Sequence, residues 1–382
     1  MKSLRGLSLS FVGALCVFFA FQNCSGYRSS SAGGYEAEMS SSIAGDSGRL
    51  GDGGAIQTDG TYQGFQSGPA AVTGYDVIVI AGQSNAAGQG AGPAVDEPGL
   101  EAQDSKIVQV GRFGNSNGKL VPGKDPLHHW LLDENWPYKG PGMSFARRYA
   151  RTMLASGRQV LIVPAAYGGS SHFYLAQAPE PGHPGTILYS GMKARIPLAL
   201  AQKDARLVAV LWHQGESDIA AHSVPPAPTG YYQLVPSMNA FINRTRGLIT
   251  ALRRDFPSST CVPFIMGEPV PAWTEPTLPN LPATKAQFKN ALIGLAQSLP
   301  CTGYVESTGL TSNRQATGIA DDIHFSAQAQ VHMGTRYFAA YSALKSGGGS
   351  RSGRSKGRNS KSSGTTFTSG GSGRKFKWQQ LK

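Results

Sequence analysis

Ser84, His324 and Asp321 are the residues whose types and positions in this sequence suit nucleophilic catalysis. Ser84 follows a run of β-branched residues (76–80), and His324 lies three positions after Asp321. A serine hydroxyl is a weak nucleophile at neutral pH unless a base accepts its proton and a third group orients that base. We therefore expect Ser84 as nucleophile, His324 as base and Asp321 as the orienting acid. Asp322 is the alternative acid.

Groups that could stabilise an oxyanion follow other strand-like segments. Gly168 comes shortly after the apolar segment 158–163, and Gln214 comes shortly after the apolar segment 207–212. Attack on a carbonyl carbon places negative charge on its oxygen, and N–H donors aimed at that oxygen lower the barrier. The expected donors are the backbone amides of Ser84 and Gly168 and the side-chain amide of Gln214.

Each of these residues also has an ordinary structural explanation when taken alone. Ser84 could cap a helix, Gly168 could belong to a turn, Gln214 could be a satisfied buried amide, and Asp321 could cap the last helix. Their combination favours catalysis. Each lies after a predicted strand or just beyond the last one, and open α/β sheets bind ligands at the carboxyl ends of their strands.

The elements that must position these residues alternate between strands and helices. Short β-branched or apolar runs predict strands at 76–80, 158–163, 207–212, 262–266 and 304–306, with a possible short strand at 106–110. Apolar residues at three- and four-residue spacing predict helices at 143–154, 191–202, 236–254, 284–298 and 326–344. This alternation predicts a parallel sheet covered on both faces, whereas 115–141 is expected to form a loop.

Several of these segments together resemble the sequence blocks of the SGNH hydrolases. More narrowly, they resemble those of the family six carbohydrate esterases and sialate O-acetylesterases. The resemblance extends over 75–345. The matching segments are 82–88, 140–146, 168–170, 212–218 and 321–325. Any one of them alone would be a weak signal, and the specificity lies in their combination and order.

The resemblance implies a flavodoxin-like three-layer α/β/α sandwich around a five-stranded parallel sheet of order 2-1-3-4-5. It implies removal of acetyl groups from sugars through an acetyl-serine intermediate, with no metal or cofactor. Gln214 stands where other SGNH enzymes use Asn. We expect Asn85, His213 and Glu216 to bind substrate, although His213 and Glu216 could instead order their loop. The alternatives are a non-catalytic glycan-binding surface lipoprotein and a short-chain esterase that acts on non-sugar esters.

Charge is distributed unevenly along the 382 residues. The formal net charge is +12, but nine Lys and Arg and no acidic residue fall within 346–382. Because much of the positive charge lies in this segment, the rest of the chain needs no polyanion partner, and we expect no nucleic acid to bind it. The segment 346–382 is expected to be a disordered basic tail, either merely solubilising or able to contact anionic surfaces. The segment 27–73 is Ser- and Gly-rich and predicts a flexible tether, which leaves 74–345 as the esterase domain.

The N-terminal segment 1–26 is typical of a secretory signal peptide. Lys2 and Arg5 precede an apolar stretch, and Cys24 and Gly26 follow it. Cys24 resembles the lipidated cysteine of bacterial lipoproteins, which would tether the protein to a membrane. The alternatives are ordinary cleavage after Gly26 and an N-terminal anchor helix. We expect an exported protein in the periplasm, anchored at the outer membrane or secreted.

Cys261 and Cys301 are the cysteines left for the mature body once Cys16 and Cys24 are assigned to the signal segment. Each stands at the beginning of a predicted strand, with one helix between them. One crossover makes the two strands parallel neighbours that begin at the same edge of the sheet. In an exported protein this predicts a disulfide at the edge opposite the active site, and two free thiols are the alternative.

Overall fold

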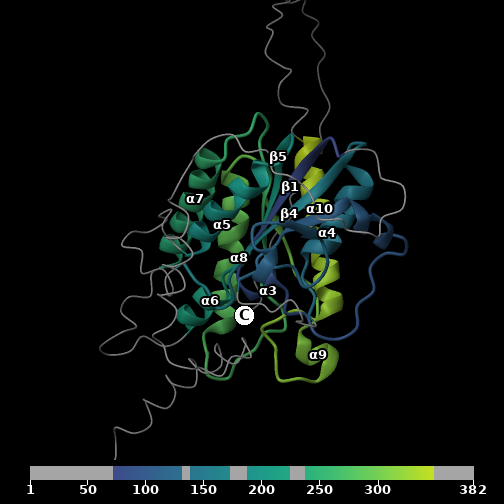
Figure 1. The fold of residues 1–382 in the computed structure, drawn as a ribbon. Coiled ribbons are helices and arrows are strands. Elements are labelled where there is room, and N and C mark those ends of the chain that lie inside the picture. The colour runs from purple at the N-terminus through teal and green to yellow at the C-terminus, as the bar shows by residue number, and fades with distance from the viewer. Residues whose placement is uncertain (1–71, 131–137, 173–186, 224–236, 348–382) are drawn as a thin grey trace, which may run out of the picture.

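The computed structural model describes residues 72–130, 138–172, 187–223 and 237–347. Seven strands form one sheet in the order β3-β2-β4-β1-β5-β6-β7, and only the β2–β3 pair is antiparallel (Figure 1). The strands are β1 (Gly74–Gly82), β2 (Ile107–Val110), β3 (Leu120–Pro122), β4 (Arg158–Ala166), β5 (Ala205–His213), β6 (Phe264–Gly267) and β7 (Thr302–Val305).

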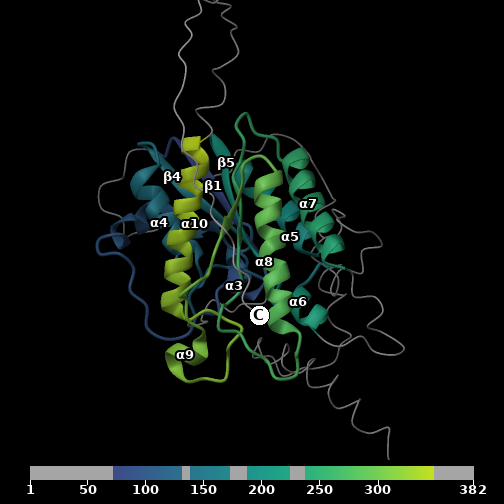
Figure 2. The ribbon, with the colours of Figure 1, turned by 180° about the vertical axis from the view of Figure 1, so that it is seen from behind.

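Helices cover both faces of the sheet, as the two opposite views show (Figures 1 and 2). The longer ones are α4 (Gly142–Thr152), α5 (Ile187–Leu200), α6 (Glu216–Ser223), α7 (Met238–Asp255), α8 (Leu281–Ser298) and α10 (Ala327–Gly347). Helices α4 and α10 pack together on one face, and α5, α7 and α8 lie on the other. Short helices α3 (Ser84–Ala87) and α9 (Asn313–Thr317) lie near the carboxyl ends of the strands.

The sheet is larger than the five strands expected from the sequence, and the order 2-1-3-4-5 does not describe its seven strands. Strand β2 extends the sheet beyond β4, and β3 lies inside 115–141, which was expected to be a loop. Strand β3 has three residues, too few for alternation to reveal it, and its pairing with β2 is what makes it a strand.

The core follows from the apolar runs of the central strands. Residues Val77 to Ala81 of β1 are at most 1% exposed, because helices cover both sides of this strand. On one face, Phe145 of α4 meets Phe338 and Tyr341 of α10 edge-on, with ring centroids 5.9 and 5.8 Å apart. These contacts hold the last helix, and the segment that precedes it, against the sheet.

The described domain continues two residues past the expected boundary, since α10 ends at Gly347. The expected signal peptide, the lipidated Cys24, all but the last two residues of the tether, and nearly all of the basic tail lie outside the described residues. Within the part that the structure describes, no helix is both long and apolar enough to cross a membrane.

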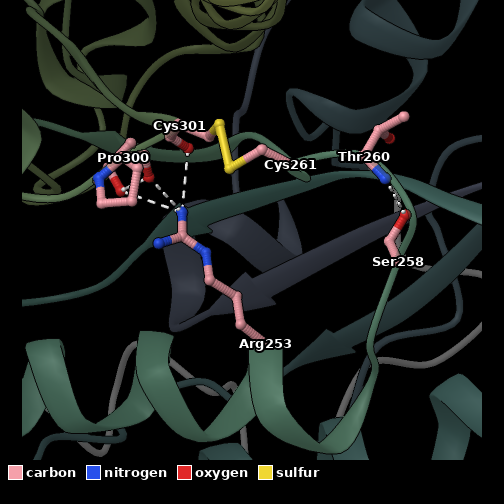
Figure 3. Close-up of a disulfide and its surroundings, with 7 residues drawn as sticks. Arg253, Ser258, Thr260, Cys261, Pro300 and Cys301 are labelled. Atoms are coloured by element: carbon pink, nitrogen blue, oxygen red, sulfur yellow. Dashed lines mark hydrogen bonds between the residues drawn. A yellow bond between two sulfur atoms is a disulfide. The ribbon is translucent and has the colours of Figure 1, made fainter.

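Cys261 and Cys301 form a disulfide between the segments that lead into β6 and β7 (Figure 3). The two Cα atoms are 6.0 Å apart, and Phe264 pairs with Thr302 in the parallel ladder that follows. The guanidinium of Arg253 donates hydrogen bonds to the Pro300 and Cys301 carbonyls beside it. A bridge across 40 residues reduces the entropy of the unfolded chain by an amount worth about 4 kcal/mol at most.

Asp76 connects the three central strands at the end of the sheet away from Ser84. Its buried carboxylate accepts hydrogen bonds from Arg158 of β4 (2.8 Å), Arg206 of β5 (2.7 Å) and the Tyr149 hydroxyl of α4 (2.6 Å). Burial alone would raise the pKa of Asp76, but the hydrogen bonds from Arg206, Tyr149 and Arg158 outweigh it and hold the pKa below its ordinary value. The carboxylate therefore stabilises the fold in its charged form.

We predict that Asp76→Asn lowers the free energy of unfolding by about 3–5 kcal/mol, because Arg158 loses its buried counter-ion. The folded pKa lies below the unfolded one. The advantage of the wild type is therefore complete above the unfolded carboxyl pKa of ~3.9 and disappears as the pH falls through the folded value. Urea unfolding at neutral and acidic pH measures both effects.

Asp204→Asn is the matched control, since Asp204 pairs with the same Arg158 but its side chain is 72% exposed. An exposed ion pair contributes little, so this variant should unfold like the wild type. Equal destabilisation by the two substitutions would contradict the role of Asp76.

Candidate active site

Ser84 occupies the sharp turn between β1 and the short helix α3. The turn requires glycine at position 82, where φ is +126° and an added Cβ would lie 1.9 Å from the His213 carbonyl oxygen of β5. After Gly82 and Gln83, the chain enters α3 at Ser84. The hydroxyl therefore stands at the carboxyl edge of the central strand, and the Ser84 side chain is 4% exposed.

His324 lies directly against this hydroxyl. Its Nε2 is 2.9 Å from Ser84 Oγ, and its Nδ1 is 2.9 and 3.0 Å from the two carboxylate oxygens of Asp321. A carboxylate can only accept, so Nδ1 carries the hydrogen and Nε2 presents its lone pair to the serine. The structure thus brings Ser84, His324 and Asp321 together in the geometry of a nucleophile, its base and an orienting acid.

The carboxylate of Asp321 is fixed in its charged form by its neighbours. Burial would raise the pKa of Asp321, but hydrogen bonds from His324 and from Asn313 Nδ2 (2.8 Å) outweigh it, and the pKa lies below the ordinary value. Asp322 faces elsewhere, because its oxygens bind Ser312 Oγ (3.2 Å) and Arg314 Nε (2.7 Å). Of the two aspartates, only Asp321 contacts His324 among the described interactions.

Asn313 is a residue that the sequence analysis missed. Its Nδ2 donates to Asp321 and to the Gln89 carbonyl (2.9 Å), and its Oδ1 accepts from the Ala91 amide (2.7 Å). It therefore connects the segment after Ser84 to the segment of His324. A signal was available, because Ser312 and Gln315 form a capping box that begins α9 at Asn313.

The loops after β1, β4 and β5 converge beside Ser84, as expected for the oxyanion donors. Gln83 Oε1 accepts from the Gly215 and Ser217 amides, both at 3.3 Å, and Ser217 Oγ donates to the Gly169 carbonyl (3.3 Å). In the described turns and loops, neither the Ser84 N–H nor the Gly168 N–H donates to a backbone carbonyl. Neither amide is therefore committed to a backbone carbonyl within these turns and loops, and their role as oxyanion donors stays a prediction.

Gln214 is held by a buried carboxyl group. Its Nε2 donates to Asp218 Oδ2 (2.6 Å) and lies 3.4 Å from the Ser170 carbonyl, and the side chain is 1% exposed. Asp218 also accepts from the His172 amide (3.1 Å), and burial raises its pKa to about 7. Asp218 thus fixes which way the amide of Gln214 points, and one hydrogen on Nε2 is left weakly bonded. No local pattern in the sequence indicates this role of Asp218.

Asn85, His213 and Glu216 form a buried polar group beside His324. They are 0, 2 and 0% exposed. Asn85 Nδ2 donates to Glu216 Oε1 (2.6 Å) and to the Ile323 carbonyl (3.0 Å), and its Oδ1 accepts from the Phe325 amide (3.1 Å). His213 contacts Glu216 Oε1 at 3.3 Å. Asn85 therefore holds both sides of His324, and substrate contact by Asn85, His213 and Glu216 stays a prediction.

Comparison with known proteins agrees with this architecture. The family model for carbohydrate esterase, sialic acid-specific acetylesterase, matches residues 74–343. The chain belongs to this family. Its relation to the sialate O-acetylesterases, expected from the sequence blocks, is thereby confirmed, and the family is one of carbohydrate acetylesterases.

Two solved structures share the fold of this esterase. A protein of Arabidopsis thaliana is 22% identical, with a TM-score of 0.52 over 70% of this chain and 98% of its own. NanS is 20% identical, with a TM-score of 0.54 over 73% of this chain and 100% of its own. At these identities the likeness shows the fold alone. No match was found among curated proteins.

We predict that Gln214→Ala lowers kcat on acetyl esters by about two to three orders of magnitude with little change in KM, because an oxyanion donor acts mainly on the transition state. Steady-state kinetics on 4-nitrophenyl acetate measures both constants. An unchanged kcat with a raised KM would assign Gln214 to substrate binding instead.

Proposed function

We propose that this protein is a serine O-acetylesterase that removes acetyl groups from acetylated sugars. The observation that carries the proposal is the contact between His324 Nε2 and Ser84 Oγ, supported by Asp321 on the other side of the imidazole. A module that only binds glycans needs no activated nucleophile, so this geometry favours catalysis over binding. Membership of the carbohydrate acetylesterase family supports an acetylated sugar as substrate.

The first half of the proposed reaction forms an acetyl-serine. Ser84 Oγ attacks the acetyl carbonyl carbon as its proton passes to His324 Nε2, and Asp321 stabilises the imidazolium that results. The tetrahedral oxyanion accepts hydrogen bonds from the Ser84 amide, the Gly168 amide and Gln214, and a single such donor is typically worth about 3 kcal/mol. The C–O bond to the sugar then breaks, and His324 returns its proton to the departing sugar oxygen.

The second half of the reaction regenerates the enzyme. Water loses a proton to His324 Nε2 and attacks the carbonyl carbon of the acetyl-serine. The bond to Ser84 Oγ breaks, acetate leaves, and the proton on His324 returns to the serine. Every step uses the chain's own residues and water.

We also propose that the enzyme is exported. Support comes from the signal-like segment 1–26 and from the Cys261–Cys301 disulfide, since structural disulfides persist in oxidising compartments. Lipidation of Cys24 would tether the enzyme to a membrane, and the basic tail would bring it near anionic surfaces.

The proposed function predicts that acetate is released from one or more members of a panel of acetylated glycans. Ser84→Ala and His324→Ala should each reduce this release by at least about three orders of magnitude, and Asp321→Asn should cost less. His332→Ala is the matched control, because His332 is an exposed histidine on α10, and it should leave turnover unchanged.

Wild-type turnover in Ser84→Ala would refute the serine mechanism. Release from simple acetyl and longer acyl esters, but from no glycan, would favour a short-chain esterase on non-sugar substrates.

A further inference from the structure

The side-chain amide of Gln214 has a buried oxygen without a hydrogen-bond donor. No described residue donates to Oε1, whereas Nε2 lies 2.6 Å from Asp218 Oδ2 and 3.4 Å from the Ser170 carbonyl oxygen. In this orientation both hydrogens of Nε2 face acceptors of the chain, so donation to a substrate oxygen would break one of these contacts. A buried acceptor without a donor is also destabilising, which indicates that a hydrogen is missing beside this amide.

Turning the amide over exchanges its oxygen and nitrogen without changing the shape of the side chain. Gln214 Oε1 then takes the position 2.6 Å from Asp218 Oδ2, where it can accept a hydrogen bond only if the carboxyl group is protonated. Nε2 moves to the position that has no hydrogen-bond partner among the described residues, and its hydrogens are no longer committed to Asp218. One proton on Asp218 therefore supplies the missing donor and releases the N–H groups of the amide.

The contacts of Asp218 place this proton on Oδ2. The other oxygen, Oδ1, accepts from the His172 amide at 3.1 Å, and Oδ2 lies farther from that amide, at 3.3 Å. A backbone N–H can only donate, so Oδ1 remains an acceptor and Oδ2 is free to carry the hydrogen toward Gln214. The 2.6 Å separation from Gln214 is below the usual range for an N–H donor and within that for an O–H donor.

The surroundings of Asp218 favour its neutral form. The residue is 2% exposed, and burial raises its pKa to about 7. Two charged groups act on it in opposite directions, because Arg244 of α7 lowers the pKa and Glu216 of α6 raises it. Burial lowers the pKa of His172 to about 3, so its imidazole is neutral, and His222 contacts only the backbone carbonyl of Asp218 among the printed hydrogen bonds of the described residues. The protonated carboxyl group is therefore well populated near neutral pH.

We propose that Asp218 is a positioning residue whose neutral carboxyl group donates from Oδ2 to Gln214 Oε1 and thereby turns the amide N–H groups toward the oxyanion. The inference rests on the proposed function and concerns how its oxyanion site is set. A neutral Asp218 also keeps a second negative charge away from the oxyanion, since like charges at close range are unfavourable. Ionisation of Asp218 at higher pH turns the amide back, and the site loses its side-chain donor.

The test is the pH dependence of kcat and KM on 4-nitrophenyl acetate. Because the neutral carboxyl group is the active form, wild-type kcat should fall by about tenfold per pH unit above ~7, while KM stays nearly constant. Both halves of the proposed reaction form an oxyanion, so this fall does not depend on which half limits kcat. In Asp218→Asn, Oδ1 still faces the His172 amide, and Nδ2 donates to Gln214 Oε1 at every pH. This variant should match the wild type within about threefold at pH ~6.5 and show no fall up to pH ~9.

Two further variants and one spectroscopic measurement separate this role from a merely structural one. In Gln214→Ala the residual kcat should no longer fall above pH ~7, because Asp218 acts only through Gln214. Asp104→Asn makes the same chemical change at a partly exposed carboxylate that pairs with Arg147, and it should keep the wild-type fall. Difference infrared spectroscopy between pH ~6 and ~9 should show the loss of a carboxylic acid band in the wild type that is missing from Asp218→Asn.

Any of three results would overturn the inference. They are a wild-type kcat that does not fall above pH ~7, a fall that persists in Gln214→Ala, and a folded Asp218→Asn enzyme that is inactive at every pH. The last would mean that the ionised carboxylate is the required form. If Asp218→Asn does not fold, the pH profiles of the wild type and Gln214→Ala decide the question. In each case Ser84-dependent turnover would leave the proposed function standing, whereas wild-type turnover in Ser84→Ala would refute the proposed function itself.

Discussion

The hydrogen bond between His324 and Ser84 is the interaction on which the rest of the site depends. It joins residues 240 positions apart, so nothing local in the sequence can set its length. The fold sets it through buried polar contacts on both sides. Asn313 holds Asp321 on one side, and Asn85 binds the Ile323 carbonyl and the Phe325 amide on the other. Asn313 and Asn85 thus serve mainly to position the imidazole of His324.

The parallel sheet explains why so many polar groups meet at one edge. Strands β4, β1 and β5 end side by side, and the segments that follow carry Gly168, Ser84 and Gln214. The opposite end of the sheet carries structural contacts: Asp76 binds Arg158 and Arg206, and the disulfide precedes β6 and β7. The contacts that stabilise the fold and the groups proposed to act in catalysis therefore lie at opposite ends of the same strands. The fully buried middle of β1 lies between them.

Features of the fold that depend on neighbouring residues could be predicted from the sequence. The β-branched run of β1, the turn at Gly82 and the positions of Cys261 and Cys301 before two strands all follow from neighbouring residues. Contacts between distant segments could not be predicted in this way. Asp218 was missed because its role depends on the amide of Gln214. The hydrogen bonds of Asn85 to both neighbours of His324 likewise join segments that are distant in the sequence. Strand β3 exists only through its pairing with β2.

The central claim remains that Ser84 is the nucleophile activated by His324. Its most direct measurement is rapid acid quenching during turnover of an activated acetyl ester, followed by peptide mass spectrometry. The account predicts an acetyl group on Ser84 of the wild-type enzyme and none in His324→Ala. Acetylation of another residue, or turnover in Ser84→Ala at the wild-type rate, would contradict it.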